Sequence, residues 1–108
     1  AIYFTNNADS GDGSLREAWT NAEDGDVIMP SPTAFTSTDT IEILLASSWS
    51  FRAANVTLDG GTKRIILNGQ NAARVGTGSS ASIVNTFRNV DFKNFSFLLF
   101  LGEVKYFS

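Results

Sequence analysis

Residues 10–28 read SGDGSLREAWTNAEDGDVI, and this stretch decides how the front of the chain folds. Ser14 and Glu17 have the S-x-x-E spacing of a capping box, in which two side chains satisfy free N–H groups at a helix start. The apolar positions that follow have the i, i+3, i+4, i+7 spacing of one helical stripe: Leu15, Ala18, Trp19 and Ala22. The stretch therefore predicts one short amphipathic helix over about 15–22.

The helix is expected to end at Asp24-Gly25-Asp26, with Gly25 in the left-handed conformation just past its last turn. Beyond it the chain lacks helical period and consists of short apolar runs closed by Gly, Asn, Asp or Ser. Such short strands cannot bury their apolar faces alone, whereas stacked turns of a solenoid can. Strands are expected around residues 2–5, 27–29, 41–45, 56–58, 65–67, 83–84, 90–92, 97–101 and 104–106.

A β-sandwich is the alternative architecture, because it also has short strands separated by turns. Asn68-Gly69 favours it, since Asn-Gly is typical of a tight hairpin turn between antiparallel strands. A short internal echo favours the solenoid. Residues 55–60 and 89–94 share one pattern: Asn, then an apolar, a polar and an apolar residue, followed by polar residues typical of a β-turn. This repeat predicts that the two segments occupy equivalent positions on different turns of the solenoid.

The composition limits the chemistry of the chain. Its 108 residues form one domain at most, and they include no cysteine and no histidine. Thiolate catalysis and the commonest general base are thereby excluded. A net charge of −3 without a clustered basic face argues against nucleic-acid binding. No apolar run approaches the ~20 residues that a membrane-spanning helix needs, so no membrane insertion is expected.

The sequence also resembles a known group of proteins. Residues 9–18 (DSGDGSLREA) and 24–28 (DGDVI) resemble the N-terminal cap of extracellular right-handed parallel β-helix proteins, including bacterial surface adhesins and polymorphic outer-membrane, autotransporter-type proteins. Residues 56–61 (VTLDGG) and 66–75 (ILNGQNAARV) resemble the first turns of the same group. Some pectate-lyase-like polysaccharide lyases begin with a similar segment.

The resemblance implies an all-β fold, a right-handed parallel β-helix (solenoid) closed by one N-terminal capping helix. The cap would span residues 1–29 and the turns residues 40–108 of a single domain. Cap residues would be Ser14, Leu15, Arg16, Glu17 and Trp19. Trp19 is expected to pack over the first turn, and Arg16 to bind a carbonyl or a carboxylate, with Asp24 and Asp26 as candidates.

No catalytic, cofactor-binding or metal-binding residues are assigned. Gly11-Asp12-Gly13 precedes a helix but lacks the lysine and spacing of a phosphate-binding loop. The carboxylates lie mostly in the cap or at turns, and Asp59 before Gly60-Gly61 has the position of a turn residue. No repeat of the calcium-binding kind is present.

The aromatic C-terminal region predicts an interface. A solenoid needs a terminal cap with a polar face, and residues 94–108 offer none. The chain is therefore expected to be a fragment of a longer protein, or to pair with another copy through its last turn. The candidate interface residues are Phe97, Phe100, Tyr106 and Phe107.

The expected function is structural: the cap and first turns of a secreted or cell-surface, adhesin-like β-helix protein, non-catalytic by itself. A carbohydrate or host-surface partner would bind on later turns. The alternatives are the front of a carbohydrate-active β-helix enzyme and a self-assembling module.

Overall fold

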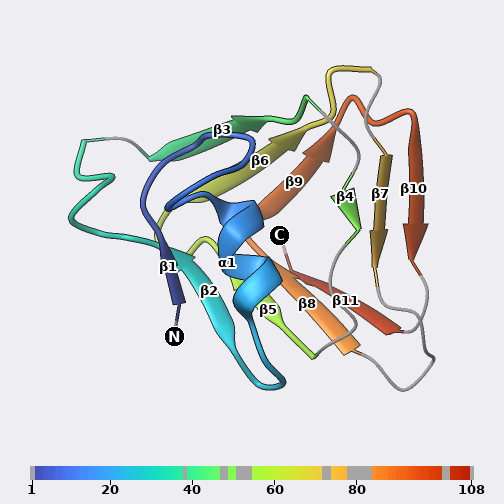
Figure 1. Ribbon diagram of the computed structural model, residues 1–108, viewed down its shortest axis with the longest axis horizontal. Helices are drawn as coiled ribbons and strands as arrows, with labels where there is room; N and C mark the ends of the chain where they lie inside the picture. Colours follow the sequence, from blue (N-terminus) through green and yellow to red (C-terminus); the bar gives the residue numbers. More distant parts are fainter. Residues whose placement is uncertain are drawn as a thin grey trace.

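The computed structural model describes residues 2–37, 39–46, 49–50, 55–71, 74–77, 84–100 and 103–107. Over these ranges the fold is mostly β, with parallel sheets and one helix (Figure 1). The elements in chain order are β1 (Ile2–Phe4), α1 (Leu15–Asn21), β2 (Val27–Pro30), β3 (Thr40–Leu44), β4 (Trp49–Ser50), β5 (Thr57–Asp59), β6 (Arg64–Asn68), β7 (Arg74–Thr77), β8 (Val84–Arg88), β9 (Val90–Lys93), β10 (Phe97–Phe100) and β11 (Glu103–Phe107).

Consecutive strands pass through three sheets in rotation. One sheet has the order β1-β2-β5-β8-β11, the second β3-β6-β9, and the third β4-β7-β10. From β2 onward, each strand pairs with the strand three places further along the chain, and every pair that the structure describes is parallel. The β-sandwich alternative is therefore wrong, because sandwich sheets are antiparallel.

The in-register partners stack their apolar side chains in columns. Ile28, Leu58 and Phe87 form one column across β2, β5 and β8, and all three are fully buried. A second column of buried residues, Ile41, Ile65 and Val90, crosses β3, β6 and β9. Side chains alternate between the two faces of a strand, so the residues on either side of each buried position point to the outer face of the sheet. Inward and outward positions thus alternate along the strands of these two sheets.

Helix α1 lies over the interior that the sheets surround (Figure 1). Its stripe of Leu15, Ala18 and Trp19, together with Ala22, belongs to the same buried cluster as both strand columns. Phe4 joins this cluster from β1 and contacts Phe35, with ring centroids 5.6 Å apart. The helix expected over about 15–22 is confirmed, and Ala22 is its C-cap rather than its last residue.

Asparagine residues close several of the corners between strands. Asn71, Asn89 and Asn94 all have positive φ angles, between 57° and 66°. Asparagine tolerates this left-handed conformation better than most residues, which explains its use at these corners. Asn68-Gly69 leads from β6 toward β7 as one such corner and does not form a hairpin.

The internal echo does not mark equivalent positions. Residues 57–59 form β5 in the first sheet, whereas residues 90–93 form β9 in the second. The two segments share inward alternation, since Val56, Leu58 and Val90 are buried, but they lie in different sheets. A period-two pattern records which face is buried, not which sheet a strand joins.

Candidate functional site

The start of α1 is closed by its own side chains. Ser14 is the N-cap, and its Oγ accepts the Glu17 N–H at 3.1 Å. Glu17 Oε1 accepts the N–H of Gly13 at 2.9 Å, one residue before the position that a reciprocal capping box uses. Both Ser14 Oγ and the Ser14 N–H contact Gly11 O, at 2.7 and 3.2 Å. The capping interaction expected between Ser14 and Glu17 is present in this shifted form.

Gly13 connects this turn to β1. Its carbonyl accepts the N–H of Thr5 at 2.8 Å, and its φ is +79°. A Cβ at Gly13 would lie 2.3 Å from Thr5 Oγ1. Only glycine fits both this left-handed conformation and the close approach. The G-D-G segment therefore serves a tight turn.

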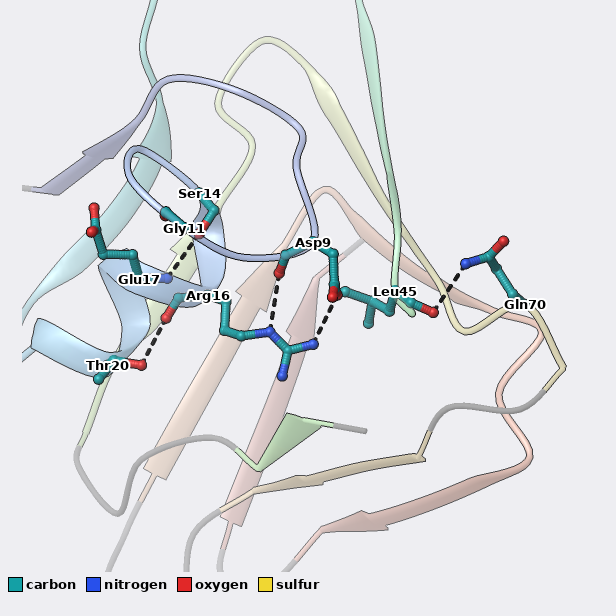
Figure 2. A network of polar contacts seen from close by, with 8 residues as sticks. All are labelled: Asp9, Gly11, Ser14, Arg16, Glu17, Thr20, Leu45 and Gln70. Carbon is teal, nitrogen blue, oxygen red and sulfur yellow. Dashed lines mark hydrogen bonds and ion pairs between the residues drawn. The ribbon is translucent and has the colours of Figure 1, made fainter. Parts of the chain in front are cut away.

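Arg16 holds the segment that leads into the helix. Its Nε donates to Asp9 O at 3.0 Å, and its Nη2 donates to Asp9 Oδ1 at 2.9 Å (Figure 2). Arg16 was expected to bind a carbonyl or a carboxylate, and it binds both in Asp9, whereas Asp24 and Asp26 were the wrong candidates. Both follow the far end of the helix, whereas Arg16 projects from its first turn, beside Asp9.

Asp24 and Asp26 instead organise the turn after the helix. Asp26 Oδ2 accepts the N–H of Glu23 at 2.7 Å, and Asp24 Oδ1 accepts the N–H of Asn55 at 2.8 Å. Gly25 has a φ of +90° within this turn, closed by Asp26 N–H to Glu23 O at 3.0 Å. Gly25 thus has the expected left-handed conformation, but it does not directly follow the last turn of the helix. The helix ends earlier, because Ala22 already leaves helical geometry with a ψ of 148°.

The Trp19 side chain reaches further into the fold than expected. It is fully buried and stacks with Phe87 of β8, with ring centroids 5.9 Å apart and an interplanar angle of 20°. Trp19 was expected to pack over the first turn of the solenoid, whereas Phe87 lies in the third strand of the Ile28–Leu58–Phe87 column. Trp19 thus connects the helix to the middle of the core.

At the other end of the first sheet, β11 presents two large aromatic side chains. Tyr106 and Phe107 are 47% and 45% exposed. The Arg88 guanidinium lies 4.2 Å from the centre of the Phe107 ring, a cation–π contact. Phe97 and Phe100, the other expected interface residues, belong to β10, and their side chains lie outside the described part of the chain.

The Tyr106 hydroxyl contacts the edge of the second sheet. It donates to Val90 O and also lies 3.1 Å from Asp91 Oδ1. Partial burial, together with the hydrogen bond to the Asp91 carboxylate and its negative charge, raises the pKa of Tyr106 above its ordinary value. The phenol is therefore neutral and acts as a donor over the physiological range.

A polar network that the sequence did not predict lies on the outer face of the second sheet. Glu42, Asn68 and Lys93 belong to β3, β6 and β9, and they converge because those strands stack. Asn68 Nδ2 donates to Glu42 Oε2 at 2.9 Å, and Lys93 Nζ lies 3.7 Å from the same oxygen. These residues are separated in the sequence by about the number of residues that lies between in-register strands. Their contact could therefore be predicted only once the register was known.

A further concave feature lies beside β1 and β2. It has a volume of about 290 Å³ and is lined by Tyr3, Met29, Pro30, Pro32 and residues 60–63. Its walls are mostly apolar, so it suits an apolar or aromatic group better than acid–base chemistry.

Two other kinds of feature are absent from the described ranges. No group of three or more Asp or Glu residues there is placed to hold a metal ion. No helix in that part of the chain is long and apolar enough to cross a membrane.

The comparisons with known proteins do not assign a family. No protein-family model matches the chain, no curated protein matches it significantly, and no solved structure does so either.

Proposed function

We propose that the chain forms the N-terminal cap and first turns of a right-handed parallel β-helix, with a structural function. The observation that carries this proposal is the rotation of consecutive strands through three parallel sheets. A chain that winds in this way stacks each turn on the one before it. Right-handed winding follows from the strong preference for right-handed connections between parallel strands.

Within this proposal, α1 protects one end of the stacked turns. An open end exposes apolar side chains and unpaired strand edges, which promote aggregation. The buried face of α1 covers that interior, and Asn7 Nδ2 contacts Glu42 O of the edge strand β3 at 3.2 Å. The parent protein would be secreted or cell-surface and adhesin-like, with ligand binding on other turns. Cleavage of a pectin-type polymer by the purified chain with calcium would contradict a purely structural role.

The proposed winding predicts which engineered cysteines form disulfides. Thr57 and Thr86 are in-register neighbours on β5 and β8, and Ile66 and Asp91 are neighbours on β6 and β9. Neighbouring strands lie about 4.8 Å apart, within the Cα separation that a disulfide spans. We expect rapid oxidation in both double variants, Thr57→Cys/Thr86→Cys and Ile66→Cys/Asp91→Cys, measured by thiol counting and peptide mapping.

The matched control shifts one partner by two residues. In Thr57→Cys/Arg88→Cys the cysteines remain on the same face of the same strands, but their Cα atoms are about 8 Å apart. This variant should keep free thiols under the same conditions. Equal oxidation of matched and shifted pairs, or no oxidation of the matched ones, would contradict the proposed winding.

Self-association through β11 is a second candidate function, supported by the exposure of Tyr106 and Phe107 at an edge strand. We expect light scattering to show a mass above that of the monomer that rises with concentration, and Phe107→Lys to restore the monomer. Leu44→Lys is the control, since Leu44 is equally exposed but lies on β3. A monomer at every concentration would exclude this function.

A further inference from the structure

The contacts around Asn68 combine the parts of an amide-transfer site. Asn68 and Lys93 are in-register neighbours on β6 and β9, and both approach Glu42 Oε2. We propose that Lys93 and Asn68 form an intramolecular isopeptide bond, with Glu42 transferring the protons. This inference does not depend on the proposed function.

The electrophile is the side-chain amide of Asn68. Its Oδ1 accepts the N–H of Gln70 at 2.8 Å and lies 3.3 Å from Asn94 Nδ2, a second donor. Two donors aimed at one carbonyl oxygen polarise the C=O bond and stabilise the negative charge that develops when Cγ is attacked. Asn68 is only 9% exposed, so these donors act in a partly water-excluded setting.

Glu42 is placed to serve both nitrogen atoms of the reaction. The same oxygen, Oε2, accepts from Asn68 Nδ2 at 2.9 Å and lies 3.7 Å from Lys93 Nζ. A carboxylate in that position can take a proton from the attacking amine and return it to the leaving nitrogen. The site therefore has a nucleophile, a proton carrier and an oxyanion-stabilising pair.

The reaction balances without any co-reactant. The neutral amine of Lys93 attacks Asn68 Cγ, and a new C–N bond forms between Nζ and Cγ. The Cγ–Nδ2 bond breaks, Glu42 delivers the proton from Nζ to Nδ2, and one ammonia leaves. No atom is oxidised or reduced.

The exposure of the site sets its rate. The side chains of Lys93 and Glu42 are 53% and 41% exposed, so water reaches both groups. Only the neutral amine is a nucleophile. We therefore expect a slow, single-turnover reaction that proceeds in the folded protein and is faster at mildly alkaline pH.

The fold also disfavours the competing reaction at Asn68-Gly69. Succinimide formation needs the Gly69 nitrogen to attack Asn68 Cγ. In the structure the Gly69 N–H donates to Lys93 O at 2.8 Å, which holds that nitrogen in the pairing between β6 and β9. A link between Asn68 and Lys93 would join two adjacent turns covalently in a chain that contains no cysteine.

The test is mass spectrometry of the folded chain after incubation at mildly alkaline pH. We expect a species that has lost the mass of one ammonia, and a tryptic product in which residues 65–74 are joined to residues 89–105. Lys93→Arg should abolish the linked product, and Glu42→Gln should slow its formation about 10²-fold or more. Lys105, an exposed lysine on β11, provides the control: Lys105→Arg should leave the link between Asn68 and Lys93 intact and give the same linked tryptic product.

The outcomes that overturn the proposal are distinct. Absence of the linked product from the folded wild-type chain would do so. Loss of ammonia without a linked product, sensitive to hydroxylamine, would identify a succinimide instead. A Glu42→Gln variant that links at the wild-type rate would overturn the role of Glu42, and circular dichroism of each variant would establish that it is folded.

Discussion

Trp19→Ala is expected to lower the free energy of unfolding by about 3–5 kcal/mol, the range for truncation of a large buried aromatic residue. Trp19 is fully buried and stacks with Phe87, so its removal leaves a cavity between α1 and β8. Because the helix has only seven residues, it is marginal without tertiary packing. Without the packing of the Trp19 side chain, the helix should therefore detach from the core.

Urea denaturation followed by circular dichroism would measure this loss. Thr20→Ala is the matched control, since Thr20 is the next residue of α1 and is exposed. Its effect should stay within about 0.5 kcal/mol of the wild type. If Trp19→Ala lowered the free energy of unfolding by less than about 1 kcal/mol, the result would contradict the inference that this side chain anchors α1 in the core. An exposed core in the variant should also increase aggregation, which light scattering would record.

Phe87→Ala is expected to cost a similar amount, about 3–5 kcal/mol. Phe87 is fully buried, stacks with Trp19 and meets Phe92 edge-on, with ring centroids 5.1 Å apart. Both substitutions open the same cavity, so their effects on the free energy of unfolding should not be additive. The double variant Trp19→Ala/Phe87→Ala should deviate from additivity by about 0.5–3 kcal/mol.

The same denaturation experiment, run as a double-mutant cycle, measures that coupling. Arg88→Ala is the control for the strand, because Arg88 follows Phe87 but faces outward, over the Phe107 ring. Arg88→Ala should lower the free energy of unfolding by about 1 kcal/mol or less, which is the contribution of an exposed cation–π contact. Strictly additive truncations of Trp19 and Phe87 would show that the two rings stabilise the fold independently.

Local patterns in the sequence predicted the features that depend on neighbouring residues. Ser14 and Glu17 mark the start of α1, because a capping interaction involves residues three positions apart. The strand expected around residues 41–45 is present as β3, and its Ile41 and Ile43 side chains are buried. Apolar period and turn residues predicted the helix and short strands stacked as in a solenoid, whereas the parallel arrangement was implied by the resemblance to β-helix proteins.

Features that depend on the register between distant strands could not be predicted in the same way. Strands β4 and β7 were not expected, since Trp49–Ser50 and Arg74–Thr77 show no clear alternation. Asp9 was not expected as the partner of Arg16, because the preceding loop folds back in a way that sequence spacing does not reveal. The convergence of Glu42, Asn68 and Lys93 likewise exists only once β3, β6 and β9 are aligned.

The spacing between in-register partners also has a kinetic consequence. Ile41 and Ile65 are 24 residues apart, and Ile65 and Val90 are 25 residues apart. The entropy lost in closing a loop depends on its length, so each of these pairings has nearly the same entropic barrier. The first pairing must form without a template, whereas each later strand adds to an edge that is already ordered. We therefore expect the capped front of the chain to nucleate folding, with the later strands adding one after another.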